Sequence, residues 1–416
     1  MKIQRVYIDG FKNLNEVNVS FDGITALVSL NNIGKSNFLL GINFGISFLK
    51  ASEEYKKQLL SNTDFIPLNR GCKDKNFVFE IEMVSELNKV ECNVVYRLEC
   101  RWNVDESMEE GVLNERLRIK QIGKSQKYET FIDRKKTSAL YKGSETASCV
   151  SKIQISNYDL AINKLKSFDK LFYNEILQKL NKLTIYMEDI LDARNFYYPE
   201  PLIKKGLGNV MFKEENLPKM LYNLKENYPD KFELLEYTYK LLFPDISEIY
   251  VKNIDFHKEK LPDNFPFVYA KQLYFLMVRD VNYDRAIDFK LMSDGAKRML
   301  VVLTRFILAE ICNVSLIAIE EPENSIHPSL LNTYLQVIDQ LLDNCRVVMT
   351  SHSPYIVNCL NENSIYVGIK GNCGAASFKK LNSKLLLKDA TNVEINTGDY
   401  LFTVLAEGTI NNYIKE

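Results

Sequence analysis

Residues 29–37 have side-chain types and a spacing that could bind the phosphates of a nucleotide. Gly34, Lys35 and Ser36 match the end of the pattern G-x-x-x-x-G-K-[ST], in which backbone N–H groups cradle phosphates, the lysine reaches the β/γ-phosphates and the hydroxyl ligates Mg²⁺. Ser29 stands in place of the first glycine, which costs backbone freedom if the loop needs a positive φ there. The pattern predicts ATP and Mg²⁺ as cofactors, bound through Asn31, Asn32, Gly34, Lys35, Ser36 and Asn37.

Two adjacent carboxylates, Glu320 and Glu321, follow the apolar run at 316–319. In phosphate-loop ATPases, the first acid at such a strand end holds Mg²⁺ through water and the second orients the attacking water. The alternative is a salt-bridge pair at the strand end, but nothing in the strand itself explains two adjacent acids at a sheet terminus. Glu320 and Glu321 are therefore candidates for these two roles.

One histidine, His352, follows a second apolar strand at 346–349. Most histidines in such loops make hydrogen bonds and take no part in catalysis. The chain has only three histidines, however, and two of them, His327 and His352, fall in this region. His352 is therefore a candidate catalytic residue.

Another candidate phosphate site is the segment 293–298, Ser-Asp-Gly-Ala-Lys-Arg. It follows a strand-like run at 287–291 and precedes an apolar helix at 299–311, so Ser293 is a natural N-cap. The N-terminus of such a helix has free N–H groups and the positive end of a dipole, which can bind a phosphate. An ordinary capped helix is the alternative.

The surrounding pattern places these segments at strand and helix ends. Residues 3–28 predict a strand, a hairpin and a strand that leads into the phosphate loop, and helical spacing follows the loop up to Leu49. From 77 to 102 the apolar period is two, which predicts an antiparallel sheet packed on one side. Helical spacing returns at 158–192 and 219–242, and the loop-rich connection between them is marked by Pro199, Pro201, Gly206, Gly208 and Pro218.

Residues 112–152 carry ten lysines and arginines against four acids, a local charge of +6. A DNA backbone or an acidic partner could bind such a stretch. The alternative is a solvated pair of strands with a loop, because charge runs often serve only solubility.

The composition is typical of a soluble globular protein: 416 residues, 46% apolar and 26% charged. A net charge of -1 excludes a global field that would attract nucleic acid. Eight cysteines without a C-x-x-C pair indicate neither a zinc site nor a disulfide framework, which favours a cytoplasmic protein. Charged and polar residues interrupt the longest apolar region, 300–319, and no signal segment is expected before Met1, so no membrane partner is predicted.

Four motifs, in the order G-K-S, S-D-G-x-K-R, I-E-E-P-E-N-S-I-H-P and T-S-H-S-P, resemble the ABC-type ATPase heads of the AAA15/AAA21 group, which includes SMC, RecF-like and overcoming-lysogenisation-defect ATPases. The opening I-D-G-F-K-N-L at 8–14 is similar to the start of those heads, as are residues 196–199 and 216–218. The resemblance is strong at 1–49 and 287–358 and thin between them. It implies an α/β fold, an ABC-type P-loop NTPase head with an antiparallel β lobe and a helical insertion.

The resemblance also implies a division into three parts. Residues 1–155 would form ATPase lobe I with the phosphate loop and the antiparallel sheet. Residues 156–265 would form a mainly helical insertion. Residues 266–416 would form lobe II with the signature, the Walker B acids and the switch histidine.

Carried over by position, the family pattern assigns a role to each candidate at the hydrolytic site. Lys35 and Ser36 would bind phosphate and Mg²⁺, Glu320 would be the Mg²⁺-side carboxylate, Glu321 the general base and His352 the switch histidine. Glu320 replaces the usual aspartate and Ser29 the usual glycine, so slow hydrolysis would be compatible with the pattern. The glutamine that couples Mg²⁺ to the lobe junction has two candidates in this chain, Gln121 and Gln154.

The resemblance to these heads also implies a dimer that sandwiches two ATP molecules. The signature residues would then close on the γ-phosphate bound by the other subunit; they are Ser293, Asp294, Gly295 and Lys297. The resemblance therefore implies a second copy of this chain as a partner, in a dimer or a higher oligomer.

Three functions remain open at this point. The turn Pro-Glu-Asn-x-x-His-Pro after the base separates the chain from transporter ATPases, whose equivalent turn resembles S-A-L-D. The first function is an ATPase subunit that senses infection in a bacterial anti-phage defence complex. It would act with a separately encoded effector, a nuclease or toxin, because the stretch after His352 is too short for the nuclease domain of related proteins. The second is a RecF/SMC-like ATPase of DNA repair or chromosome maintenance. The third is an ATP-gated scaffold with little hydrolysis.

Overall fold

The computed structural model describes residues 1–61, 66–103, 111–123, 127–188, 202–204, 216–255, 267–269, 272–324, 326–341, 345–361 and 363–415. The chain forms two compact units. The first contains Met1–Met187, Val314–Glu321 and Asn344–Glu416, and the second contains Glu188–Asn313 and Pro322–Asp343. The three-part division at 1–155, 156–265 and 266–416 stays a prediction.

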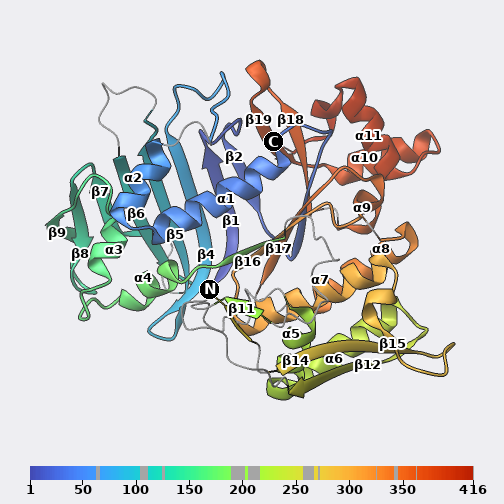
Figure 1. Cartoon of the computed structure of the whole chain (residues 1–416). Coiled ribbons are helices and arrows are strands. Elements are labelled where there is room, and N and C mark those ends of the chain that lie inside the picture. The colour runs from blue at the N-terminus through green and yellow to red at the C-terminus, as the bar shows by residue number, and fades with distance from the viewer. Residues whose placement is uncertain are drawn as a thin grey trace. The chain divides into compact units, whose positions relative to one another are not determined.

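The first unit contains an eight-stranded antiparallel sheet with the strand order β2-β1-β4-β5-β6-β7-β8-β9 (Figure 1). The strands are β1 (Lys2–Asp9), β2 (Val17–Ser20), β4 (Phe77–Leu87), β5 (Val90–Arg101), β6 (Gly111–Gln121), β7 (Glu129–Lys135), β8 (Ser138–Lys142) and β9 (Cys149–Gln154). The helices that lie along one face of this sheet are α1 (Lys35–Lys50), α2 (Glu53–Ser61), α3 (Ala161–Leu165) and α4 (Asn174–Asn181).

The one-sided packing predicted for this sheet is confirmed. Phe77, Phe79, Ile81 and Met83 alternate along β4 and are fully buried in the main core. The glycine at 45 lets α1 approach this face closely, because a Cβ there would lie 2.5 Å from a ring carbon of Phe79. The other face carries polar and charged residues of the same strands, as the period of two requires.

The first unit also contains a six-stranded sheet, with the order β10-β16-β17-β3-β18-β19. Strands β16, β17, β3 and β18 run parallel to one another, and β19 is antiparallel to β18. The strands are β3 (Ile24–Val28), β10 (Ile185–Glu188), β16 (Leu316–Glu320), β17 (Arg346–Ser351), β18 (Ile365–Lys370) and β19 (Ala376–Lys380). The C-terminal helices are α9 (Pro354–Cys359), α10 (Ser383–Asn392) and α11 (Thr397–Glu407), with short 3-10 turns at Asn372–Gly374 and Ile410–Tyr413.

The second unit combines helices with short antiparallel sheets. Its helices are α5 (Leu217–Asn227), α6 (Pro229–Leu242), α7 (Asp294–Ile311) and α8 (Pro328–Leu341). Strands β12 (Ile246–Asp255), β14 (Gln272–Asp280) and β15 (Ile287–Asp288) form one sheet, and β11 (Leu202–Lys204) pairs with β13 (Phe267–Tyr269). A 3-10 turn, Phe289–Leu291, leads into α7, whose Ala296 carbonyl accepts a hydrogen bond from the buried Tyr239 hydroxyl of α6 at 3.0 Å.

The helical expectation for 158–192 is wrong over most of its length. Only the short helices α3 and α4 form there, and residues 185–188 are the strand β10 at the edge of the six-stranded sheet. Most of the apolar residues in this spacing are buried, but pairing with the distant strand β16 decided the conformation of 185–188. Residues 189–192 lie outside the described residues.

The expectation for 219–242 becomes two helices, because Pro229 has no N–H to continue α5 and instead begins α6. Asn216 caps α5, since its side chain accepts a hydrogen bond from the Lys219 N–H at 3.0 Å. The predicted loop-rich connection falls mainly outside the described residues; this applies to Pro199, Pro201, Gly206, Gly208 and the resemblance at 196–199.

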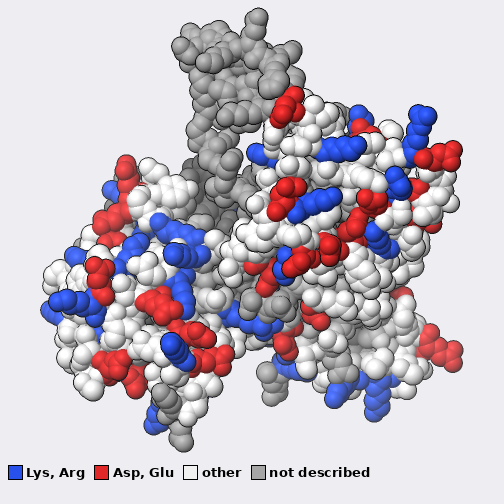
Figure 2. All heavy atoms as spheres, turned by 90° about the horizontal axis from the view of Figure 1, so that it is seen from below, with Lys and Arg blue, Asp and Glu red and all other residues white. Residues whose placement is uncertain are grey.

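The basic stretch at 112–152 forms four strands, β6 to β9, whereas the alternative to a DNA-binding stretch was a pair of strands with a loop. Several of its charges are paired. Arg116 is 3.0 Å from Asp133, and Lys142 is 2.6 Å from Glu129. On the face of the molecule drawn in Figure 2, lysine and arginine side chains are interspersed with acidic ones. Lys124 lies outside the described residues.

Arg134 belongs to this basic stretch, but it is not a surface charge. Its side chain is fully buried, with Nη1 at 3.6 Å from the carboxylate of the equally buried Glu115. Its other nitrogens donate to the carbonyls of Lys136 at 2.6 Å and Ser156 at 2.8 Å. Removing one partner of such a pair leaves an uncompensated buried charge, which costs about 3–5 kcal/mol. Arg134 therefore stabilises the β lobe and is not available to a DNA backbone.

Among the described residues, no helix combines the length and the apolar character needed to cross a membrane.

Candidate nucleotide-binding site

Three neighbouring parallel strands bring the phosphate loop, the two acids and the histidine to one edge of the six-stranded sheet. β3 ends at Val28, β17 at Ser351 and β16 at Glu320. The register pairs Val28 with Ser351 and Thr350 with Glu320, so the carboxyl ends of the three strands are aligned. Ligands of open α/β sheets bind outside this edge.

The phosphate loop passes from β3 into α1 through unusual backbone conformations. Gly34, the N-cap of α1, has a φ of 121°, and Asn32 has a φ of 61°. The Lys35 side chain is buried, and its Nζ donates to the carbonyls of Ser29 at 2.9 Å and Leu30 at 3.2 Å. The loop therefore holds the lysine charge against its own carbonyls, at the N-terminus of α1.

Ser29, which replaces the first glycine, does not have the positive φ that would have made the replacement costly. Its hydroxyl donates to the Leu30 carbonyl at 2.9 Å and lies 3.3 Å from Lys35 Nζ. Room for the extra side chain comes from Gly368 on β18, where a Cβ would lie 2.8 Å from the Cβ of Ser29. The expected loss of backbone freedom therefore does not arise, because φ of Ser29 is not positive, and the neighbouring strand leaves space for the side chain.

Asn13 is a residue of this loop region that the sequence reasoning missed. Its Nδ2 donates to the Ile33 carbonyl at 3.0 Å, and its Oδ1 accepts from Asn37 Nδ2 at 2.8 Å. The signal was present, because Asn13 belongs to the opening segment at 8–14, but that segment marked only a resemblance. The nucleotide contact expected of Asn37 stays a prediction.

Glu321 and His352 are in contact at the same sheet edge. Glu321 Oε1 lies 3.0 Å from His352 Nδ1, and the Glu321 N–H donates to the Thr350 carbonyl at 2.9 Å. Glu321 has a φ of 46°, which is uncommon for a residue with a side chain and costs about 1–3 kcal/mol. The two side chains are 36% and 42% exposed, so solvent and a ligand can reach them.

Ser36 and Glu320 are the residues predicted to ligate Mg²⁺. Ser36 is exposed in the first turn of α1, and Glu320 is half-buried at the end of β16. Within the described ranges, no group of three His, Cys, Asp or Glu side chains is placed to hold a metal. Mg²⁺ in nucleotide sites uses one or two protein ligands together with phosphate oxygens and water, so a hydroxyl and one carboxylate fit it. Gln121 and Gln154, at the ends of β6 and β9, stay predictions for the coupling glutamine.

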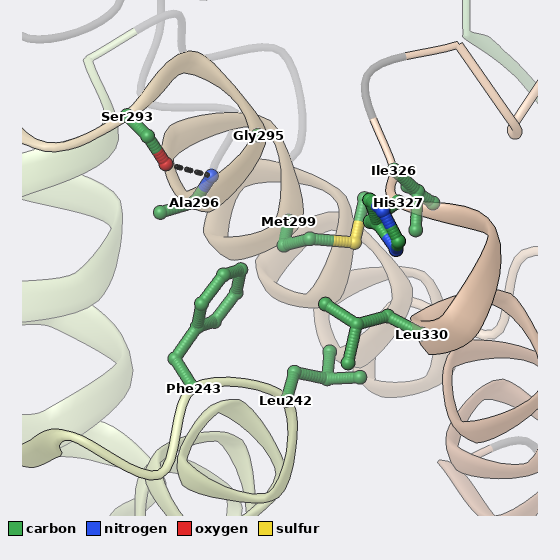
Figure 3. Close-up of a pocket in the computed structure, with 9 residues that line it drawn as sticks. All are labelled: Leu242, Phe243, Ser293, Gly295, Ala296, Met299, Ile326, His327 and Leu330. Carbon is green, nitrogen blue, oxygen red and sulfur yellow. Dashed lines mark hydrogen bonds between the residues drawn. The ribbon is translucent and has the colours of Figure 1, made fainter.

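The segment at 293–298 belongs to the second unit and begins α7. Ser293 is the predicted N-cap, since its hydroxyl accepts from the Ala296 N–H at 3.2 Å (Figure 3). Lys297 Nζ lies 3.4 Å from the Asp294 carboxylate. A cavity of about 290 Å³ adjoins this cap, and its walls are mostly apolar. It is lined by Leu242, Phe243, Ser293, Gly295, Ala296, Met299, Ile326, His327 and Leu330.

Solved structures of SMC heads match nearly the whole chain. The SMC head domain from Thermotoga maritima is 12% identical over 92% of this chain and 99% of its own, with a TM-score of 0.44. An Smc head bound to the C-winged helix domain of ScpA is 14% identical over 93% and 100%, with a TM-score of 0.50. An Smc head with an extended coiled coil, bound to the C-terminal domain of ScpA from Pyrococcus furiosus, is 13% identical over 94% and 99%, with a TM-score of 0.45. No curated protein matches the sequence.

The fold and the loop at the sheet edge define the class of this protein as an ABC-type P-loop ATPase head. The Smc head with a TM-score of 0.50 has this fold, and the α/β fold class predicted from the sequence is confirmed. A family model described as an AAA ATPase domain, AAA15, matches residues 1–357. The chain belongs to this family, which confirms the resemblance stated on its four motifs.

Proposed function

We propose that this chain binds Mg²⁺–ATP at its phosphate loop and hydrolyses it at the edge of the six-stranded sheet. One observation carries the proposal: Lys35, Glu321 and His352 come from distant parts of the sequence and follow the aligned carboxyl ends of β3, β16 and β17. A hydrolytic phosphoryl transfer needs a phosphate clamp, a metal and a residue that positions water, and these are the groups supplied here.

Each residue has a defined task in this proposal. Lys35 Nζ exchanges its loop carbonyls for phosphate oxygens, which form stronger, charge-assisted hydrogen bonds. Ser36 and Glu320 would hold Mg²⁺, which supplies neutralisation of the phosphate charge. Glu321 accepts a proton from the attacking water, and His352 orients the Glu321 carboxylate through the contact between them.

Replacing the loop lysine tests the binding step. We expect Lys35→Ala to weaken ATP affinity by about 10- to 100-fold, because each lost hydrogen bond to a charged group is worth about 1.5–3 kcal/mol. Titration calorimetry of the purified variants measures this change. Lys50→Ala, at the exposed far end of the same helix, is the matched control and should bind ATP as the wild type does. Equal affinities for ATP in both variants would remove the phosphate loop from the proposal.

The proposed active form is a dimer of this chain. Ser293, Asp294, Gly295 and Lys297 form the start of α7, whose capped N-terminus suits a phosphate. In the proposal this N-terminus closes on the γ-phosphate of ATP held by a second copy. A two-fold dimer then gives two equivalent sites, and ATP favours closure over ADP because the γ-phosphate contact is made only in the closed state.

We further propose that ATP-driven closure regulates a separately encoded effector in a bacterial anti-phage defence complex. Two observations support a partner protein: the family resemblance on four motifs, and the similarity to an Smc head that is bound to the C-winged helix domain of ScpA. Only the family resemblance supports a nuclease or a toxin as the effector. The alternative function, an ATP-gated scaffold with little hydrolysis, would use the same ATP-driven closure of the dimer.

The competing function, an ATPase that acts directly on DNA, makes a different prediction. Because several charges of the basic stretch are paired or buried, we expect duplex DNA to leave the ATPase rate unchanged. Reversing the exposed charges with Lys135→Glu and Lys136→Glu should also have no effect, like the control pair Lys379→Glu and Lys380→Glu on β19. DNA stimulation that only the first pair abolishes, with a log K–log salt slope of about -0.9 per phosphate contact, would favour the DNA-repair function.

A further inference from the structure

We infer that Asn13 is a positioning residue that holds the phosphate loop in its nucleotide-binding shape. The inference rests on the proposed ATP site and assigns a role to a residue of the opening segment, outside the G-K-S motif. Asn13 touches the loop and the first turn of α1 through a single amide group, so one side chain orders both structures.

The contacts of the Asn13 amide use its donor and its acceptor in different directions. Nδ2 donates to the Ile33 carbonyl at 3.0 Å, which precedes Gly34 in the loop. Oδ1 accepts from Asn37 Nδ2 at 2.8 Å, in the first turn of α1. An ionised carboxylate of similar size cannot make both bonds, because it only accepts hydrogen bonds and the Ile33 carbonyl requires a donor.

Gly34 shows how closely this side chain fits against the loop. A Cβ on Gly34 would lie 2.8 Å from Asn13 Oδ1, so the amide occupies the space that any larger residue would need. The φ of 121° at Gly34 also disfavours other residues. The glycine of the motif is thus required by the loop backbone and by Asn13 together.

The backbone of Asn13 is itself fixed, so the amide has a firm support. Its carbonyl accepts from the Ala376 N–H at 2.7 Å, and the Asn15 N–H donates to the Ala376 carbonyl at 2.9 Å. Nδ2 also lies 3.4 Å from the Gly374 carbonyl in the turn between β18 and β19. Asn13 therefore connects the phosphate loop to the turn between β18 and β19 and to the start of β19.

The hydrogen bonds of Asn13 should increase the affinity of the phosphate loop for the nucleotide. The loop includes two residues with positive φ, Asn32 and Gly34, and without the bonds from Asn13 it would populate other conformations. Apparent affinity falls by the fraction of molecules that hold the competent shape. The hydrogen bonds of the Asn13 amide go to the loop, to α1 and to the turn at Gly374, and none goes to Glu321 or His352, so the chemical step at saturating ATP should be little changed.

The test compares Asn13→Ala, the nearly isosteric Asn13→Asp, and the control Asn18→Ala from the exposed side of β2. Asn13→Ala should raise the Kd and KM for ATP by about 10-fold, from the loss of the hydrogen bonds to Ile33 and Asn37, with kcat within about twofold of the wild type. Asn13→Asp keeps an acceptor for Asn37 but faces the Ile33 carbonyl with an oxygen, so it should bind ATP no better than Asn13→Ala. Asn18→Ala should match the wild type.

A double-mutant cycle separates positioning from general destabilisation. If Asn13 acts partly through Asn37, the double variant Asn13→Ala/Asn37→Ala should bind ATP more tightly than the product of the two single effects on Kd predicts. Fully multiplicative effects, or wild-type affinity in Asn13→Ala, would overturn the inference. A lower kcat with unchanged KM would also overturn it, because that is the pattern of a smaller folded fraction.

A measurement without nucleotide keeps this inference distinct from the proposed function. The Phe38 N–H donates to the Gly34 carbonyl at 3.1 Å, at the junction of loop and helix. In Asn13→Ala its hydrogen exchange should be about 10-fold faster, while that of the Ala51 N–H, bonded to the Ser47 carbonyl at the other end of α1, should not change. Faster exchange in a protein that binds no ATP would reject only the proposed function. Unchanged exchange at Phe38 would reject the role of Asn13.

Discussion

Glu321→Gln is expected to bind ATP as the wild type does and to hydrolyse it about 10²- to 10⁴-fold more slowly, the range for loss of general-base assistance. Glutamine keeps the shape of the side chain but cannot accept the proton of the attacking water. It can still accept a hydrogen bond from a protonated His352 Nδ1, so the contact of 3.0 Å and the strained backbone at φ 46° need not change. Single-turnover ATPase assays measure the chemical step directly.

The matched control is Glu91→Gln, on an exposed position of β5, which should hydrolyse ATP at the normal rate. His352→Ala should give an intermediate rate, because it removes the residue that orients the carboxylate and leaves the base in place. Normal hydrolysis by Glu321→Gln would show that another group activates the water. In that case the strain at Glu321 would serve the turn between β16 and the following loop.

Mixing two inactive variants should restore activity if two chains share each site. At an ATP concentration near the wild-type Kd, we expect Lys35→Ala and Ser293→Asp to be nearly inactive separately, the first because its loop binds ATP weakly and the second through repulsion between the new carboxylate and the γ-phosphate. A mixed dimer has one site with both lesions and one intact site. Random exchange at equal amounts should therefore recover about a quarter of the wild-type rate, given the two-fold symmetry.

The choice of aspartate follows from the structure. Ser293 caps α7 through its bond to the Ala296 N–H, and aspartate is an equally good cap, whereas a residue without a capping oxygen would cost about 1 kcal/mol of stability. Each variant mixed with a second preparation of itself is the control and should stay inactive. Differently tagged chains confirm that subunits exchange. Confirmed exchange without recovery would favour a site completed within one chain, or obligatory coupling of the two sites.

The sequence by itself determined the features that depend on neighbours within a few residues. Strand β3, the loop and α1 follow one another where the pattern placed them, and Ser293 caps its helix through a bond that spans three residues. The acids at the end of β16 and the histidine after β17 were found in the same way, because an apolar run followed by polar residues marks the end of a buried strand. Parallel strands then align such ends at one edge.

Only the tertiary structure decided the features that depend on distant residues. Ser29 is tolerated because Gly368 lies beside it, Asn13 bonds to the loop from another strand connection, and Arg134 is a core residue because Glu115 and several carbonyls surround its charge. Residues 185–188 became a strand for the same reason, since an edge of the six-stranded sheet was available to pair with them. The local sequence pattern indicates which residues are buried. The packing of the whole unit determines which partner pairs with each buried polar group or strand.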